Sequence, residues 1–322
     1  MPELSGPDSL SAIAAACLAN PGLTAKAEIA LVGEVLGGTD WMGGPGDDGA
    51  VVTAHGGPVI ACGEALFPPF VAADPHGAGF AAVLTNVNDV AAMGGVPLGV
   101  VDTVVASEPV ARKALAGMRE AAELYDVPII GGHLTIHDGD PAISAFAVGA
   151  SAAPLSVTRA APGQSLVVAA ALDGRMRADF PFFPAFESRG RRSAGDVRLL
   201  GVLAESGVVV AAKDISMAGL VGSLAMLLEP GRLGVTLDVD AVPAPPGVPL
   251  TRWFNCFPSF GFLLCVPAGR EPECLAAFAE RDLAAAVVGT LDDTGTLALS
   301  RPDEHVEVLS LHDFRVTGLP RA

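Results

Sequence analysis

The stretch GGPGDDGA at residues 43–50 places two adjacent carboxylates, Asp47 and Asp48, between glycines. A third acid follows at Glu64, and a fourth, Asp89, lies within the run NVNDVAAMGG at residues 86–95. Carboxylate oxygens grouped in this way are the ligands that a divalent cation takes when it is held against phosphate oxygens. The sequence therefore predicts a metal-dependent phosphate site in its N-terminal half.

The same glycines formally match a dinucleotide-binding fingerprint, with Glu64 at the place of its ribose-binding acid. In that fold the glycine turn follows a strand and opens a helix whose N-terminus meets the pyrophosphate. Here Asp47 and Asp48 stand where the phosphate would lie. The residues that follow, 50–53, the turn 55–58 and 59–62, predict a β-hairpin rather than a helix. The context therefore argues against a dinucleotide fold.

Charge limits the possible partners. The 36 acidic and 19 basic residues give a net charge of −17, which argues against nucleic acid or an anionic membrane as a partner. No Lys or Arg occurs between Ala27 and Ala111. Any phosphate bound by this region must therefore be met by metal ions or backbone N–H groups.

The apolar content also has to be explained. The longest uncharged runs, such as residues 141–158, are interrupted by Pro, Gly, Ser and Thr, whereas a membrane-spanning helix needs about 20 predominantly apolar residues. No signal segment is recognisable at Met1. The five scattered cysteines predict neither a zinc site nor a disulfide framework. We expect a cytoplasmic protein without a membrane span.

At 322 residues the chain is long enough for two domains, which we place at 1–158 and 159–322. Strands and helices are mixed without a regular alternation, and this favours an α+β fold. The expected helices are 8–20, 24–36, 75–93, 109–125, 221–228 and 272–281. The expected strands are 50–53, 59–62, 98–105, 128–130, 142–149, 165–170, 208–212, 235–239, 261–266 and 284–291.

Three further candidates follow from these elements. On the helix that begins at Asp74-Pro75, Asn86 and Asp89 share a face. A buried carboxylate is costly unless it is paired or bound to metal. Asp89 is therefore either a metal ligand or a hydrogen-bonded core residue. His133 follows two glycines at a strand end, where backbone can approach a ligand. The segment 174–192 interleaves phenylalanines with arginines and is either an anion-binding lid or a solvated face; its arginines are Arg175, Arg177, Arg189, Arg191 and Arg192.

Four motifs together resemble the superfamily of aminoimidazole ribonucleotide (AIR) synthase, which also includes thiamine-monophosphate kinase, selenophosphate synthetase and the hydrogenase maturation dehydratase. The motifs are GDDGAV at 46–51, NDVAAMGG at 88–95, GGH at 131–133 and DISMAGL at 214–220. The chain is most similar to the stand-alone AIR synthase-related group, through residues 213–220 and FPSFGF at 257–262.

The resemblance implies an N-terminal α+β domain whose strands join a partner's in a dimer barrel, an ATP site near that interface, and a C-terminal α+β domain. It implies magnesium held by Asp47, Asp48, Glu64, Asp89 and Asp214. It implies nucleotide contacts at Gly46, Asp47, Asp48, Asn86, Asn88, Asp89, Gly132 and Ser216. The homodimer is also favoured by the valine- and alanine-rich strands of the N-terminal half.

This sequence departs from the family's pattern at several positions. The Ser/Thr-Thr-Asp of many relatives is Cys62-Gly63-Glu64, and Met217 stands where kinase-like members carry a second acid. Gly131-Gly132-His133 is as in the selenophosphate branch, but Cys17 and Lys26 do not form the active loop of that branch.

The expected function is Mg²⁺-dependent transfer of the ATP γ-phosphoryl group to an oxygen of a small amide-like or carboxylate substrate. Lys213 and Asp214 are the expected catalytic groups. His133 is either a proton shuttle or a structural hydrogen-bond donor. The alternative is a non-catalytic nucleotide-binding or scaffold member of the same fold.

Overall fold

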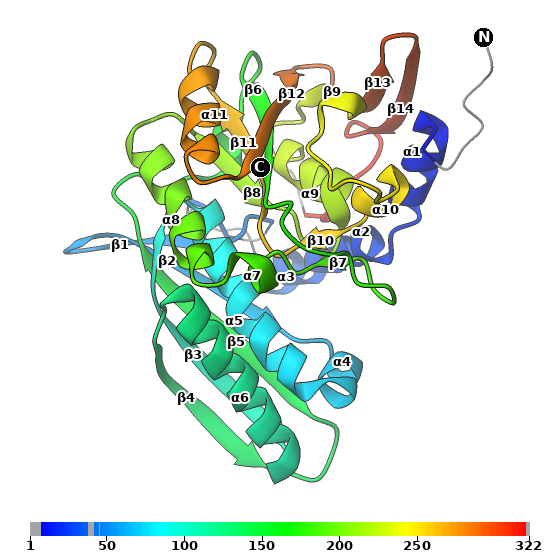
Figure 1. Cartoon of the computed structure of the whole chain (residues 1–322). Coiled ribbons are helices and arrows are strands. Elements are labelled where there is room, and N and C mark those ends of the chain that lie inside the picture. Colours follow the sequence, from blue (N-terminus) through cyan, green and yellow to red (C-terminus); the bar gives the residue numbers. More distant parts are fainter. Residues whose placement is uncertain (1–7, 38–41, 45, 320–322) are drawn as a thin grey trace. The chain divides into compact units, whose positions relative to one another are not determined.

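The computed structural model describes residues 8–37, 42–44 and 46–319, so Pro45 of the acidic loop lies outside it. The chain forms two compact units (Figure 1). The N-unit comprises residues 48–154 and 189–205, and the C-unit comprises the described parts of 1–47, 155–188 and 206–322. The division thus differs from a single break after residue 158. The first helices belong with the C-terminal half, and residues 189–205 belong with the N-terminal half.

The N-unit is a five-stranded sheet with helices. Its elements are β1 (Ala50–Ala54), β2 (Gly57–Ala65), α4 (Pro68–Ala73), α5 (Pro75–Ala92), β3 (Val96–Ala106), α6 (Glu108–Tyr125), β4 (Ile129–Ile136), β5 (Ala142–Ala150) and α8 (Arg192–Glu205). The strand order is β1-β2-β5-β3-β4; β3 and β4 run parallel, and the other neighbours are antiparallel. The α+β class expected from the sequence is confirmed.

Helix α5 begins and ends where its sequence requires. Asp74 is the N-cap, its Oδ1 accepts a hydrogen bond from Gly77 N at 2.9 Å, and Pro75 occupies the first turn. At the other end Gly94 has φ +70, and Gly95 N donates to Val90 O at 2.9 Å. This is a C-terminal stop that a glycine with positive φ makes possible. The helix therefore runs almost over the predicted range.

The two faces of the N-unit sheet differ. Helices α5 and α6 cover one face (Figure 1), where Ile60, Val100 and Val104 are fully buried. The residues that alternate with these, such as Val52 and Phe146, are 37% and 48% exposed. The sheet is open rather than a closed barrel within the part of the chain described. The predicted dimer barrel is therefore not a property of one chain.

Helices α5 and α6 approach closely because each carries a glycine at the crossing. A Cβ on Gly79 would lie 1.9 Å from Ala114 O, and a Cβ on Gly117 would lie 2.0 Å from His76 O. Both distances are far below van der Waals contact, so no other residue fits at either position without separating the helices.

The C-unit contains a seven-stranded sheet of order β14-β13-β9-β12-β6-β11-β8 and a two-stranded pair, β10-β7. Its strands are β6 (Ser165–Ala170), β7 (Phe182–Phe183), β8 (Ala211–Asp214), β9 (Gly234–Asp238), β10 (Phe257–Pro258), β11 (Gly261–Val266), β12 (Ala284–Asp292), β13 (Thr296–Arg301) and β14 (Glu304–Ser310). Its helices are α1 (Leu10–Leu18), α2 (Pro21–Ala25), η1 (Lys26–Ile29), α3 (Ala30–Leu36), η2 (Val157–Arg159), α9 (Gly219–Leu228), η3 (Val239–Ala241), α10 (Leu250–Trp253) and α11 (Glu271–Ala279). The short α7 (Phe186–Arg189) spans the boundary between the units. The central strands β6 and β11 are buried along their whole length.

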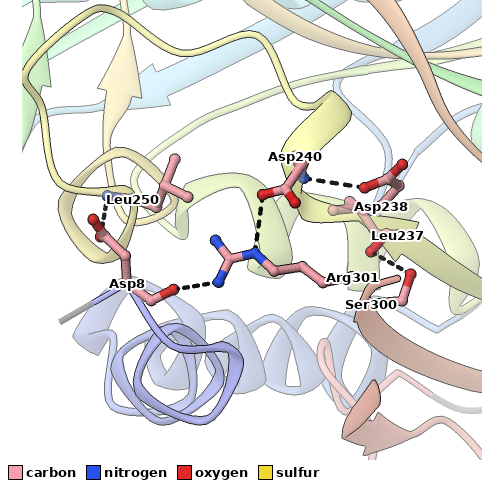
Figure 2. A network of polar contacts seen from close by, with 7 residues as sticks. All are labelled: Asp8, Leu237, Asp238, Asp240, Leu250, Ser300 and Arg301. Atoms are coloured by element: carbon pink, nitrogen blue, oxygen red, sulfur yellow. Dashed lines mark hydrogen bonds and ion pairs between the residues drawn. The ribbon is translucent and has the colours of Figure 1, made fainter. Parts of the chain in front are cut away.

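A polar network ties the start of α1 to the C-unit sheet (Figure 2). Arg301 donates from Nε to Asp240 Oδ1 at 2.9 Å and from its guanidinium to Asp8 O at 2.8 Å. Asp8 Oδ1 in turn accepts from Leu250 N at 2.7 Å. These long-range contacts explain why the first helices belong to the C-unit.

Three expected elements differ from the structure. The helix expected over 24–36 is broken into α2, η1 and α3, because Asn20 and Pro21 start a separate helix with an Asn20 Oδ1 cap on Gly22 N at 2.8 Å. The strand expected to end at residue 130 continues to Ile136 as β4, because it pairs with β3 over its full length. The strand expected over 208–212 is shifted to 211–214 by its pairing with β11.

Among the described residues no helix is both long enough and apolar enough to cross a membrane.

We expect Gly117→Ala to lower the free energy of unfolding by about 1–3 kcal/mol, because an overpacked contact between backbones outweighs the gain in helix propensity. Urea unfolding followed by circular dichroism measures the change. Gly56→Ala is the control, since nothing lies within 4 Å of a Cβ added at that turn. Equal stability of the two variants would contradict the close crossing.

Candidate functional site

The acidic loop holds its two aspartates differently. Asp47 Oδ2 accepts hydrogen bonds from Ser156 Oγ at 2.7 Å and from Val157 N at 3.2 Å. Ser156 is itself fully buried and lies 109 residues further along the chain. Asp47 is therefore an anchor of the loop to the start of η2, and at least one of its oxygens is used by the protein itself.

Asp48 and Asp89 come together within the N-unit. The two side chains offer carboxylate oxygens within 4.8 Å of each other. Asp89 is only 6% exposed, whereas Asp48 is partly exposed. Two carboxylate oxygens at this separation can both reach one Ca²⁺- or Mg²⁺-type cation, whose ligands are oxygens.

Cys62 and Glu64 project from the face of β2 that α5 covers, the face of the buried Ile60. Burial is the largest cause that raises the pKa of the Cys62 thiol well above its ordinary value. The negative charge of Asp89 raises that pKa further, a backbone hydrogen bond at Ala147 lowers it, and the charges of Glu64 and Asp48 raise it again. The thiol is thus protonated. Asp48, Glu64 and Asp89 all lie close enough to Cys62 to influence its pKa.

Asn86 has a structural role, and the nucleotide contact expected of it stays a prediction. It is fully buried; Nδ2 donates to Ala82 O at 2.8 Å and to Ala145 O at 3.1 Å, and Oδ1 accepts from Cys62 Sγ at 3.4 Å. Both the nitrogen and the oxygen of its side-chain amide thus have hydrogen-bond partners within the protein. It fixes the rotation of α5 against β2 and β5, and with it the direction of Asp89 one turn later.

Gly132 also has a packing role. A Cβ at this position would lie 2.6 Å from Asp102 Oδ2 on the neighbouring strand. Burial raises the pKa of Asp102, so the glycine leaves room for a carboxyl group that the strand pair partly covers. This explains the glycine without a bound phosphate.

His133 does not lie with the acids. It pairs with Thr103 on β3, and that register places it on the face opposite Val104 and the helices. Two strands, β5 and β3, separate β4 from β2. The expectation that His133 moves a proton at the metal site is therefore not supported within one chain.

The fourth motif forms a separate group in the C-unit. Lys213 Nζ lies 3.5 Å from Asp214 Oδ1, and both side chains are almost fully buried at the end of β8. Ser216 N donates to Ser223 Oγ at 3.1 Å, while the buried Ser216 Oγ has no hydrogen-bond partner within the described residues. Gly219 has φ +69, and a Cβ there would lie 2.4 Å from Phe254 O. The loop therefore presents one buried hydroxyl group just before α9.

The arginine-rich segment is not one lid. Phe182 packs against Phe186 and Phe257, and Phe183 packs edge-on against Trp253. Phe183 therefore belongs to the C-unit core, whereas Phe180 is 42% exposed. Arg177 pairs with Glu187.

Arg189 is a correction to the predicted anion-binding set. Its Nε contacts Asp196 Oδ2 at 2.5 Å, and both side chains are 1% exposed. A substrate anion has no access to a guanidinium held in this way. The other members of the predicted set, Arg175, Arg177, Arg191 and Arg192, are exposed.

Sequence reasoning missed the residues that hold the site from a distance. Ser156 fixes Asp47, Ser223 fixes the backbone of Ser216, and Asp196 occupies Arg189. Ser156 and Ser223 stand in apolar surroundings with no motif of their own. Their roles depend on contacts between distant segments, which one sequence does not reveal.

Comparison with known proteins identifies the family. Residues 46–151 match the model of the AIR synthase related protein N-terminal domain, and residues 190–301 match that of the C-terminal domain. The uncharacterized protein sll0787 of Synechocystis is 33% identical over 278 residues, which cover 85% of this chain and 86% of that protein. The chain belongs to the AIR synthase-related family.

Further relatives of this AIR synthase-related protein have named activities. The selenide, water dikinase of Myxococcus xanthus is 28% identical over 71% of this chain and 70% of its own length. The solved structure of AaThiL complexed with AMPPCP and TMP has a TM-score of 0.67 at 20% identity and covers 87% of this chain and 95% of its own. The chain spans about half the length of the T. maritima PurL chains it matches, which were solved with ATP and with ADP (45% and 48%). The expected superfamily is thereby confirmed.

Proposed function

We propose that this AIR synthase-related protein is a magnesium-dependent enzyme that transfers the γ-phosphoryl group of ATP to an oxygen of a small amide-like or carboxylate substrate. The observation that carries the proposal is the pair of carboxylates on Asp48 and Asp89, whose oxygens lie within 4.8 Å of each other. The nucleotide complexes of AaThiL and PurL support ATP as the ligand class.

The residues present fit a divalent cation. Asp48 and Asp89 would hold the cation. Glu64 projects from β2 on the face of the sheet that α5 covers. Asp214 is proposed as a further ligand from its place in the fourth motif alone. Asp47 would position the loop through Ser156 rather than bind the cation through Oδ2. When bound, the metal neutralises charge on the triphosphate, which is most of what phosphoryl transfer requires.

The remaining site residues would bind and orient. Lys213, held beside Asp214, is placed to offer a positive charge to an anionic group. The buried Ser216 hydroxyl, without a partner in the described chain, can donate to a phosphate oxygen. Gly46, with φ +96, and Asn88, buried on α5, remain proposed nucleotide contacts. Arg191 is proposed to meet an anionic substrate.

We expect Asp89→Asn to weaken magnesium-dependent ATP binding by about tenfold or more, because a charge-assisted contact with the cation is lost. Titration calorimetry with and without magnesium measures the change. Asp140→Asn, in an exposed turn, is the matched control. Equal binding of ATP in EDTA by the wild-type protein would overturn the metal-dependent site.

Turnover separates the enzyme from a non-catalytic nucleotide-binding protein. We expect ADP release that depends on one member of a panel of amides, amidines and carboxylates. Asp214→Asn should abolish it, whereas Arg191→Ala should raise KM for that substrate and leave Mg-ATP affinity nearly unchanged. Tight Mg-ATP binding with no ADP release across the panel would favour the scaffold alternative.

We also propose that the protein is a homodimer through the open face of the N-unit sheet. That face carries Val52, Val101, Val105 and Phe146 and is not covered by the described helices of its own unit. The Phe146 ring lies over Gly63 on this face, where a Cβ would come within 2.3 Å of the ring. Exposed apolar surface of this kind marks an interface of the obligate type.

We expect light scattering to give a dimer at micromolar concentration, and Phe146→Asp to shift it toward monomer. The reason is that a carboxylate would then be buried without a partner at the interface. Val202→Asp, on α8 of the same unit and 62% exposed, should leave the mass unchanged. A monomeric wild-type protein would overturn the proposal.

A further inference from the structure

The segment that follows β14 returns to the acidic loop. Residues 315–319, which we call the tail, follow β14 and the turn after it. Within the tail Val316 is fully buried and Thr317 is 3% exposed. Buried backbone polar groups are costly unless they are hydrogen-bonded, so the partners of these residues have to be identified.

Glu229, the C-cap residue of α9, is that partner. Its Oε1 accepts a hydrogen bond from Val316 N at 2.6 Å, and its Oε2 accepts from Thr317 N at 3.1 Å and from Thr317 Oγ1 at 2.6 Å. One carboxylate thus captures two consecutive backbone N–H groups and a hydroxyl. Hydrogen bonds to an ionised acceptor are stronger than neutral ones, so this contact fixes the tail in place.

Beyond Thr317 the tail packs against Gly46. A Cβ on Gly46 would lie 3.2 Å from Leu319 Cδ1 and 3.8 Å from Thr317 Cγ2. Leu319 N donates to Thr317 Oγ1 at 3.3 Å, so the same threonine that binds Glu229 also sets the position of Leu319. On the other side, a Cβ on Gly318 would lie 2.8 Å from Ala30 Cβ in α3. The tail therefore fills the space between α3 and the glycine turn that precedes Asp47.

The turn at Gly46 is restrained by the tail and by bonds of Asp47 among the described residues. Its glycines give it wide conformational freedom, and Gly46 itself has φ +96. Asp47 N donates to Gly44 O at 2.9 Å, and the carboxylate of Asp47 is held by Ser156 and Val157. These bonds restrain Asp47, whereas packing of the tail restrains the residue before it.

We propose that Glu229 and Thr317 are positioning residues of the acidic loop: they lock the tail against Gly46, and the tail limits the conformations of the turn from which Asp47 and Asp48 extend. Neither residue needs to touch a ligand. The effect of the lock on Mg-ATP rests on the proposed function, but the lock itself does not.

Hydrogen exchange followed by mass spectrometry tests the lock without any ligand. In the full-length protein, Glu229→Gln replaces one acceptor oxygen by an amide donor that faces the Thr317 N–H group. We expect exchange in a peptide spanning residues 42–50 to become about tenfold faster, together with that of the tail. Glu280→Gln is the matched control, because Glu280 is also a helix C-cap residue, on α11, and is exposed.

Thr317→Val gives a second, milder variant that keeps the shape of the side chain and removes its hydroxyl. Thr317→Val should speed exchange of the tail and of residues 42–50 by a smaller factor. It tests the lock even if Glu229→Gln does not fold. Faster exchange of the tail with wild-type exchange over 42–50 would overturn the proposal, as would no change in either segment.

Calorimetry with Mg-ATP then separates this proposal from the function proposed above. If the wild-type protein binds Mg-ATP, both variants should bind it several-fold more weakly and Glu280→Gln should bind it normally. Normal Mg-ATP binding by a variant whose 42–50 segment exchanges faster would overturn the positioning role. If the wild-type protein does not bind Mg-ATP, faster exchange over 42–50 still supports the lock, and it is the nucleotide site that fails.

Discussion

Keeping a carboxylate inside an apolar helix is the constraint on which this structure depends. Asp89 is 6% exposed on α5, a helix that buries fourteen of its residues. A buried carboxylate raises the free energy of the folded state unless another group compensates its charge. A fold that retains such a residue must therefore hold α5 firmly, so that the Asp89 carboxylate keeps one position beside Asp48.

The contacts that fix α5 do not touch the site themselves. Asp74 and Gly94 set where the helix begins and ends, and Asn86 sets its rotation by bonding to β5 and to Cys62. The glycine crossing with α6 sets its depth. Arg198 of α8 donates to Tyr125 O at 2.9 Å and to Asp126 O at 2.7 Å, and so caps the C-terminus of α6. The position of Asp89 thus depends on β2, β5 and α6, and α8 in turn supports α6.

These relations also show what the sequence could predict. The limits of α5 were predictable, because Asp74-Pro75 and Gly94-Gly95 are local signals that act within one turn. The α+β class was predictable from the mixture of strands and helices without a regular alternation. Arg189 was not, because its partner Asp196 gives no signal beyond being an acid one turn into the next helix. The face on which His133 lies depends on the length and register of β4, and both are set by pairing with β3 rather than by the residues of β4.

The difference between Asp47 and Asp48 could not be read from the sequence for a related reason. Two adjacent acids look equivalent in a glycine-rich loop, yet Asp47 bonds to Ser156 of the C-unit and Asp48 lies beside Asp89 of the N-unit. Neighbouring side chains in a turn point in different directions, so a bond that fixes one also fixes the direction of the other through the shared backbone. The hydrogen bond from Ser156 to Asp47 therefore also helps to set the direction of the Asp48 side chain.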